Sequence, residues 1–496
     1  MNRDSVATRL MTSGGDGRIV LRPETGLNRY LSAPRPSPVL AYASSTANDI
    51  SIAAFAHVEQ KLRKIAPQGK LSPVDYAGCL DDLRDRIRRA YDVPQDVAIL
   101  FAPSGTDLEY VGLACTAGLA GGGTHNVLLG AEEVGSGCIH SAYGRYFAES
   151  TALGIATVPG SPVPGLGETH VEMIDIPVRD PTGRARPSAE ITSAIRTAIA
   201  HAGSADRHPL VHVVHGSKTG LIVPTTEDLD ELRSEAGDGV TLVVDACQAR
   251  ITSPAINDYL RRGAIVFLTG SKFMGGPPFS GMALIPNNLA ERARALPEGF
   301  ATIFRRAEWP AGWPGAERLA DSANLGLLLR LEASVFELER FQKLGPDEVS
   351  RVILAFHQAV RSEIIVETAA RRVAPYPPGE KETADNHPIE MRTLSTLDLS
   401  ALGGSATFED AQRWHQELLG HGIRLGQPVK CVKLADGRWG ATLRIGLSMP
   451  MIVERAGLGD QELAASFRHD MGRVGEALEM CAGGGPSGRT RQTNSL

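Results

Sequence analysis

A lysine and an aspartate in two separate loops carry the chemistry that this sequence suggests. Lys272 lies in the Thr-Gly-Ser-Lys loop 269–272, 27 residues after Asp245, and Gln248 follows that aspartate by three positions. An ionised carboxylate keeps a neighbouring pyridine nitrogen protonated, and a lysine amine can form a Schiff base with an aldehyde. Both groups together would make the ring of pyridoxal 5'-phosphate an electron sink, with Gln248 directed at the ring hydroxyl oxygen. We therefore expect a pyridoxal-phosphate site with Lys272 and Asp245 as catalytic residues.

Further polar loops follow other apolar runs and could hold the phosphate of this cofactor. The Ser-Gly-Thr loop 104–106 comes after the run 98–101 and directly before an expected helix. Backbone N–H groups and hydroxyls at a helix N-terminus bind phosphate, although the same pattern alone is commonly an ordinary N-cap. His215 ends the run 210–214 and is either a further cofactor contact or a buried core histidine. Lys218, nearby, lacks the glycine flanks and the upstream acid of Lys272.

Short apolar runs alternate with helical patterns and indicate how these loops are positioned. The runs cover residues 98–101, 127–129, 210–214, 241–244 and 264–268, and helical patterns cover 83–91, 190–201 and 226–236. Repeated strand and helix units predict an α/β fold with a mostly parallel sheet wrapped by helices. In such a sheet ligands collect at the carboxyl ends of the strands, where the polar loops stand.

Composition divides the chain into four parts. Residues 1–40 are rich in Gly, Pro, Arg and Ser and are expected to form an irregular arm, followed by a large cofactor-binding domain at 41–325. A leucine-rich helical pattern at 319–341 leads into a smaller α+β domain at 326–482. The polar tail 483–496 is expected to be disordered.

Charge and cysteine usage exclude several classes of protein. The 496-residue chain has 57 acidic and 51 basic residues, and a net charge of -6 without a basic stripe gives no reason to expect nucleic acid. Six cysteines without C-x-x-C spacing argue against a zinc ribbon and a disulfide framework, and we expect no metal site. We find neither a signal peptide nor a membrane-spanning stretch, so the expected location is the cytoplasm.

The order of the motifs, Ser-Gly-Thr, Thr-Gly, Asp-x-x-Gln and Thr-Gly-Ser-Lys, resembles the class V aminotransferase superfamily of fold type I, which includes cysteine desulfurases. The resemblance extends from about Tyr42 to Leu447. It implies a fold type I transferase with a seven-stranded-type sheet, acting on a small-molecule amino acid, with amine transfer as the default reaction. It also implies that Arg444 binds the substrate carboxylate through a bidentate guanidinium. Ser322 would reach the phosphate in the neighbouring subunit, which implies a homodimer with shared active sites. The expected cofactor contacts are Ser104, Gly105, Thr106, His215, Asp245, Gln248, Thr269, Ser271, Lys272 and Ser322.

Two departures from the superfamily pattern leave the reaction type open. Ser271 stands where desulfurases have a histidine, and Glu133–Gly137 stands where the superfamily often has a ring that stacks on the cofactor. Cys431 has a spacing similar to that of the desulfurase cysteine, and Lys430 and Lys433 would lower its thiol pKa modestly, although an ordinary loop or strand cysteine is the favoured interpretation. The alternatives are therefore a C–S lyase or desulfurase-like reaction with Cys431 as a catalytic residue, and a non-catalytic pyridoxal-phosphate sensor or partner subunit.

Overall fold

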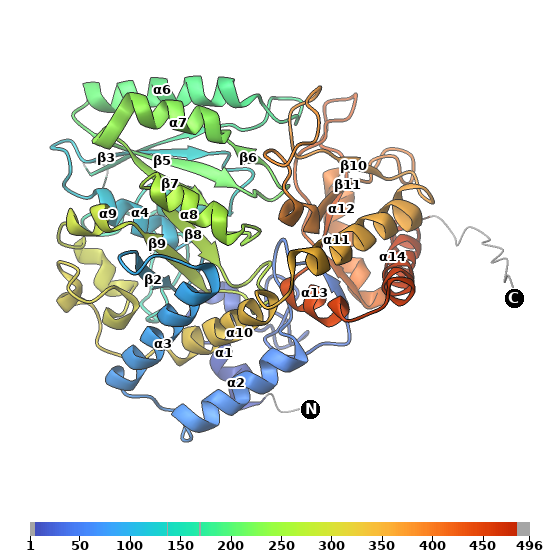
Figure 1. The fold of residues 1–496 in the computed structure, drawn as a ribbon, viewed down its shortest axis with the longest axis horizontal. Helices are drawn as coiled ribbons and strands as arrows, with labels where there is room; N and C mark the ends of the chain where they lie inside the picture. Colours follow the sequence, from blue (N-terminus) through green and yellow to red (C-terminus); the bar gives the residue numbers. More distant parts are fainter. Residues whose placement is uncertain (1–4, 136, 168–169, 484–496) are drawn as a thin grey trace, which may run out of the picture.

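A large twisted sheet forms the centre of the computed structural model, which describes residues 5–135, 137–167 and 170–483 (Figure 1). The order of its strands is β2-β9-β8-β7-β5-β3-β4, and the short strand β6 pairs with β5 in addition. The strands are β2 (Ala98–Ala102), β3 (Thr124–Leu129), β4 (Val171–Ile176), β5 (His208–His215), β6 (Ile222–Val223), β7 (Thr241–Asp245), β8 (Ile265–Thr269) and β9 (Gly281–Ile285). Neighbouring strands from β8 to β4 are parallel, whereas β9 is antiparallel to both β8 and β2. The expected mostly parallel sheet is therefore confirmed, with β4, β6 and β9 as strands that the sequence did not reveal.

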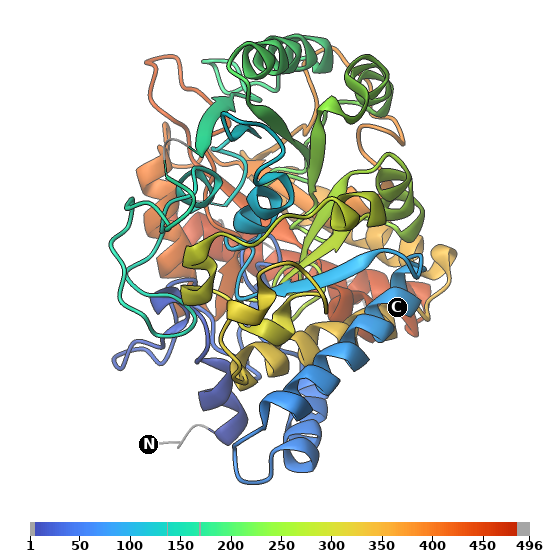
Figure 2. The ribbon, with the colours of Figure 1, turned by 90° about the vertical axis from the view of Figure 1, so that its left-hand side faces the viewer.

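Helices cover both faces of this sheet because successive strand residues point to opposite sides. In β7, Leu242 and Val244 pack into the same core as α6, α7 and α8, whereas Val243 packs against α4. The helices are α3 (Pro73–Tyr91), α4 (Leu108–Thr116), α5 (Cys138–Ala142), α6 (Ser188–Ser204), α7 (Thr226–Ala236), α8 (Ser253–Arg261) and α9 (Asn287–Glu291). Figure 2 shows the green helices α6 and α7 at one end of the sheet and the blue α3 at the opposite end.

The N-terminal arm contains more regular structure than its composition predicts. Helix α1 (Val6–Met11) begins at a cap in which the Ser5 side chain accepts the Thr8 N–H. Its buried side chains pack against α2 (Ile52–Ile65) and α10 (Leu325–Phe341), so apolar burial offsets the cost of ordering this short helix. Helix α10 begins at Leu325, later than the leucine pattern indicated, because Asn324 caps it.

A smaller α+β unit follows α10 and lies beside the large sheet (Figure 1). Its antiparallel sheet has the order β10 (Arg371–Val373), β11 (Leu394–Asp398), β13 (Thr442–Gly446). The helices around it are α11 (Pro346–Val360), α12 (Phe408–Glu417), α13 (Met449–Ala456) and α14 (Asp460–Cys481). Separately, β1 (Leu40–Tyr42) pairs in parallel with β12 (Ile423–Leu425) and so ties the early chain to this unit. Residues 484–496 of the expected tail lie outside the described residues.

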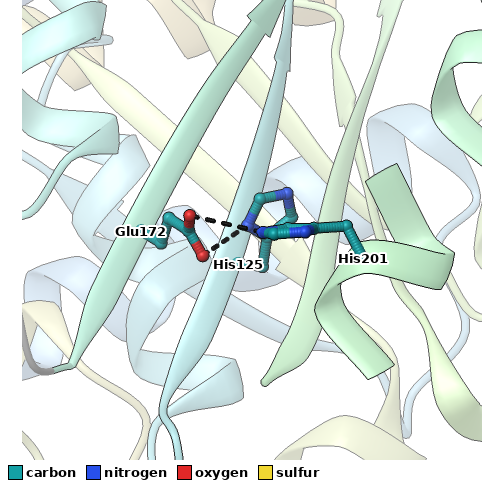
Figure 3. Close-up of side chains that lie close together, drawn as sticks. All are labelled: His125, Glu172 and His201. Atoms are coloured by element: carbon teal, nitrogen blue, oxygen red, sulfur yellow. Dashed lines mark hydrogen bonds and ion pairs between the residues drawn. The ribbon is translucent and has the colours of Figure 1, made fainter. Parts of the chain in front are cut away.

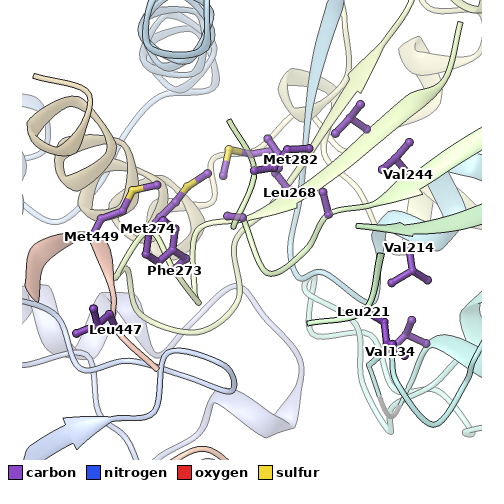
Figure 4. Packing of buried hydrophobic residues seen from close by; sticks show 14 of the residues in the cluster. Val134, Val214, Leu221, Val244, Leu268, Phe273, Met274, Met282, Leu447 and Met449 are labelled. Atoms are coloured by element: carbon purple, nitrogen blue, oxygen red, sulfur yellow. The ribbon is translucent and has the colours of Figure 1, made fainter. Parts of the chain in front are cut away.

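The apolar core continues from the sheet to the loop that carries Lys272 (Figure 4). Leu268 on β8 belongs to the same buried cluster as Phe273 and Met274, which directly follow the lysine. The Phe273 carbonyl accepts the Met449 N–H at 2.7 Å, at the start of α13. The loop is therefore fixed on one side by the sheet and on the other by the smaller unit.

None of the helices described here combines the length and apolarity needed to cross a membrane.

Candidate functional site

A cavity of about 200 Å³ opens at the carboxyl ends of the parallel strands. Most of the side chains expected at the site line it, namely Ser104, Gly105, Thr106, Asp245, Gln248, Thr269, Ser271, Lys272 and Arg444. These residues come from the last positions of β7 and β8, from the loops after β2, β7 and β8, and from β13, so elements far apart in sequence meet at one place.

The loop after β8 holds Lys272 in a tight turn. The Lys272 carbonyl accepts the Gly275 N–H at 3.0 Å and also accepts a hydrogen bond from the side-chain amide of Asn48. Gly270 is required here because a Cβ at that position would lie 2.1 Å from the Ser334 hydroxyl of α10. The main chain around Lys272 is thus held by hydrogen bonds and close packing, while its side chain lines the cavity.

Asp245 ends β7 and has two titratable neighbours that the sequence did not single out. One of its oxygens accepts the Cys247 N–H at 3.0 Å. Burial, reinforced by the charge of Asp245, raises the pKa of Glu109 well above its usual value, and Glu109 also lines the cavity. Glu109 Oε2 lies 3.4 Å from His212 Nε2, and burial lowers the pKa of that histidine to about 4. Burial therefore disfavours the charged form of both Glu109 and His212, so this pair opposes a second charge beside Asp245.

The Ser-Gly-Thr loop precedes α4, which begins at Leu108 as expected. Ser104 Oγ donates to Asp107 Oδ2 at 2.6 Å, and burial raises the pKa of Asp107 to about 7. A Cβ on Gly105 would lie 2.8 Å from the Thr269 methyl group, so the glycine lets the loops after β2 and β8 approach each other. This close pair of loops forms one end of the cavity.

The N-terminal arm contributes a cation at the same end, which sequence reasoning missed. Arg18 Nη1 donates to Thr106 Oγ1 at 3.3 Å, and its other donors bond Asp16. Its guanidinium lies over the rings of Phe147 and Phe279, at 4.9 and 5.0 Å from their centroids. Arg18 therefore places a positive charge directly beside the loop expected to bind phosphate.

Gln248 is held at both ends of its amide. Its Nε2 donates to the Ser45 carbonyl at 3.2 Å, and its Oε1 accepts from Arg250 Nη1 at 2.8 Å. Arg250 is fully buried, and its guanidinium lies 5.1 Å from the centroid of Phe273. This arginine links the loop after β7 to the loop after β8, so it fixes the relative positions of Gln248 and Lys272.

Arg444 lies in the middle of β13 and is buried, with its guanidinium at the cavity. Its donors bond the Gln427 carbonyl at 2.8 Å, Thr46 Oγ1 at 3.0 Å, and the carbonyls of Ser45 and Lys218 at 3.2 and 3.3 Å. Burial lowers its pKa to about 10, which still leaves it charged at pH 7. The network fixes the orientation of the guanidinium, as recognition of a carboxylate requires.

Lys218 also lines the cavity, although its sequence surroundings made it a weaker Schiff-base candidate than Lys272. Burial, together with the nearby charge of Arg444, lowers its pKa to about 8. Its Nζ donates to the Glu132 carbonyl at 3.0 Å. Lys218 and Arg444 therefore form a pair of neighbouring cations on one side of the cavity.

Glu133 joins two of the cavity loops. Its carboxylate accepts from Ser217 Oγ at 2.8 Å and the Thr219 N–H at 3.1 Å, and it pairs with Arg179. Burial alone would raise the pKa of Glu133, but Arg179 and Ser217 outweigh it, and the pKa lies below its ordinary value. Val134 and Gly135 then line the cavity where related proteins were expected to have a stacking ring, and Ser136 lies outside the described residues.

Three expected site residues lie outside the cavity of this chain. His215 is buried, with its Nδ1 3.1 Å from the Tyr259 hydroxyl. Ser322 is exposed and its hydroxyl accepts from Arg305 Nε at 3.2 Å. Cys431 is buried beside Arg179, and burial raises its pKa to about 12. The expectation that neighbouring lysines lower this pKa is wrong, because loss of water around the thiol dominates and the cations that oppose it are Arg179 and Arg444.

Solved structures of other proteins are similar to this chain in fold. No protein-family model matches this chain, and no curated protein matches its sequence. Among solved structures, a NifS-like protein is similar over 88% of this chain and 99% of its own, with 10% identity and a TM-score of 0.51. The ureidoglycine-glyoxylate aminotransferase of Bacillus subtilis is similar over 92% of this chain and 95% of its own, with 11% identity and a TM-score of 0.53.

The chain has the fold type I architecture. The likeness covers nearly the whole length of both solved structures and about nine-tenths of this chain. The expected fold is therefore confirmed. At this level of identity the likeness shows the fold alone.

Proposed function

We propose that this chain is a pyridoxal-phosphate-dependent enzyme of the class V aminotransferase type that transfers the amino group of a small amino acid. The observation that carries the proposal is that one cavity brings together Lys272, Asp245, Arg444 and the loop 104–106. These groups supply an amine, a carboxylate, a carboxylate-binding guanidinium and a phosphate-binding loop, at the carboxyl ends of parallel strands.

The cavity has features that fit the cofactor. Ser45 Oγ is buried at the cavity wall and has no hydrogen-bond partner among the described residues. One oxygen of Asp245 accepts a main-chain N–H, and burial disfavours a second negative charge on Glu109, so Asp245 can supply the negative charge that a protonated pyridine nitrogen needs. Thr269, Gly105 and Thr106 form the opposite end, with Arg18 adding positive charge for a phosphate.

The remaining roles follow from the same geometry. When bound, pyridoxal phosphate supplies an electron sink that makes the Cα proton of an amino acid removable. The Lys272 amine would hold the cofactor aldehyde, exchange with the substrate amine and then move the proton at Cα. Arg444 would bind the substrate carboxylate, and the neighbouring ammonium of Lys218 would add to that attraction.

The position of Cys431 favours amine transfer over the desulfurase-like alternative. Its buried thiol, with a pKa of about 12, lies outside the cavity that Lys272 lines. A reactive cysteine needs an exposed thiolate, which this surrounding disfavours. The presence of Lys272, Asp245 and Arg444 in the same cavity likewise favours an enzyme over a cofactor-binding sensor.

We also propose that the chain forms a homodimer with shared active sites. The support is the resemblance at Ser322, which is exposed on its own chain and could therefore reach a neighbouring subunit. A molar mass in solution near 53 kDa, the mass of one 52.8 kDa chain, would contradict this proposal.

Visible absorption spectroscopy tests the proposed function. The native protein incubated with pyridoxal phosphate and then dialysed should show a Schiff-base band that Lys272→Ala cannot regenerate. Lys218→Ala is the matched control, since it changes a second lysine at the same cavity. An amino acid that shifts the band and releases a keto acid supports amine transfer, whereas release of sulfide from cysteine supports the alternative. Absence of the band in the native protein would refute the proposal.

A further inference from the structure

Three side chains of metal-binding type meet at the amino ends of β3 and β4, next to α6 (Figure 3). His125 is the second residue of β3, Glu172 is the second residue of β4, and His201 lies on α6. Lys272 and Asp245 follow or end strands at their carboxyl ends, so this cluster lies at the opposite edge of the same sheet. Its role is therefore separate from the chemistry of the cavity.

The spacing of the ligand atoms matches a metal site. His125 Nδ1 lies 3.2 Å from Glu172 Oε2, and His201 Nε2 lies 3.4 Å from Glu172 Oε1. Ligands bound to zinc at about 2.0–2.1 Å in a tetrahedron are separated by about 3.3 Å. The three ligand atoms all lie within 4.8 Å of one another, so a small rotation of the exposed His201 side chain completes the set. Figure 3 shows both imidazoles directed at the same carboxylate.

The surroundings of the three residues also suit an ion. The His125 side chain is 3% exposed, whereas Glu172 and His201 are 40% and 55% exposed. The buried His125 side chain provides one immobile ligand. The more exposed Glu172 and His201 allow an ion to enter from solvent and leave room for a water molecule as the fourth ligand. Two histidines and one carboxylate are a ligand set that zinc and related divalent ions favour over calcium or magnesium.

We propose that His125, Glu172 and His201 bind a divalent transition-metal ion of the zinc class and thereby fasten α6 to β3 and β4. The ligands are 47 and 29 residues apart in sequence. The three ligands come together only in the folded chain, so metal binding stabilises the folded state by an amount that rises with the logarithm of the affinity. The ion has a structural role in this part of the large domain.

Arg207 sets a limit on the affinity. Its Nε lies 3.4 Å from Glu172 Oε2, so the carboxylate already faces one cation. A metal ion would therefore compete with this guanidinium for the Glu172 carboxylate. Arg207→Gln removes the competing charge, and we expect it to tighten zinc binding severalfold.

Calorimetric titration of the metal-stripped full-length protein with zinc chloride tests the proposal. We expect one site per chain that His201→Ala and Glu172→Gln each weaken at least tenfold, and a zinc-dependent rise in unfolding temperature that both variants lose. His469→Ala, an exposed histidine on α14, is the matched control and should bind zinc like the native chain. His201 is exposed, so its removal leaves the fold intact and keeps the test valid if Glu172→Gln is unstable.

Two results would overturn the proposal. One is the absence of zinc binding to the native chain. The other is equal binding by the native chain and His201→Ala, which would place the ion elsewhere, for example at the partly exposed thiols of Cys79 and Cys481. Both readouts are independent of pyridoxal phosphate, so failure here leaves the proposed function untouched.

Discussion

Replacing Asp245 by Asn should remove a charge that the proposed chemistry needs while leaving the fold in place. Asparagine has nearly the same size, and its Oδ1 can still accept the Cys247 N–H that Asp245 accepts at 3.0 Å. Opposite unit charges about 4 Å apart interact by about 4 kcal/mol at an effective dielectric constant of about 20. Since about 1.4 kcal/mol corresponds to a factor of ten, we expect the rate of Cα proton removal to fall about 1,000-fold.

Glu109 provides an internal check on this magnitude. Burial comes first among the causes that raise its pKa, and the charge of Asp245 comes second. Removing the charge of Asp245 makes ionisation of Glu109 easier, so Glu109 could replace part of the lost charge. We therefore expect Glu109→Gln alone to have a small effect and the double variant Asp245→Asn, Glu109→Gln to be slower than Asp245→Asn.

The assay is a single-turnover measurement of the visible band after mixing the cofactor-loaded protein with an amino acid that the native protein accepts. Thermal unfolding of each variant shows whether the fold is preserved. A loss of less than tenfold in a folded Asp245→Asn variant would refute the electrostatic role that we assign to this residue.

Three further predictions use other groups at the cavity. Burial lowers the pKa of Lys218 to about 8, so its ammonium is present below that pH and is lost above it. KM for the amino acid should therefore rise as pH passes 8, and a Lys218→Met variant that keeps this rise would contradict the assignment. Cys431→Ala should change amine transfer less than twofold, measured as keto acid release, because the thiol lies outside the cavity. Arg18→Gln should weaken pyridoxal-phosphate retention about 10- to 150-fold, since hydrogen bonds to charged groups contribute about 1.5–3 kcal/mol. If Arg18→Gln and the native protein have the same dissociation constant for pyridoxal phosphate, measured by equilibrium dialysis, Arg18 does not contact the phosphate.

The parallel sheet and its polar loops were predictable because each depends on a short stretch of sequence. Apolar runs of strand length predict β7 and β8, and the carboxyl end of each parallel strand gives the position of the residue that follows it. Asp245 and Lys272 could therefore be placed at one edge of the sheet without coordinates. The Ser-Gly-Thr loop before α4 was found in the same way.

The missed residues depend on contacts between distant parts of the chain. Arg18 meets Thr106, 88 residues away, and nothing near Arg18 in the sequence indicates that pairing. Glu109 and His212 are polar residues within largely apolar elements, a signal that fits a buried core pair as well as a site. The metal-binding type cluster combines two strands and a helix, so no short spacing motif exists that could reveal it.

The pairing of β1 with β12 has a consequence for how the protein is made. The chain just after β1 supplies Thr46, whose hydroxyl accepts the Gln427 N–H across 381 residues, and also the Ser45 carbonyl that Arg444 bonds. A ribosome has therefore to synthesise most of the polypeptide before this wall of the cavity can close. Contacts of such sequence separation form late and slowly. We infer that the cavity stays incomplete until the chain has been made as far as Arg444, and that the cofactor binds tightly only after that point.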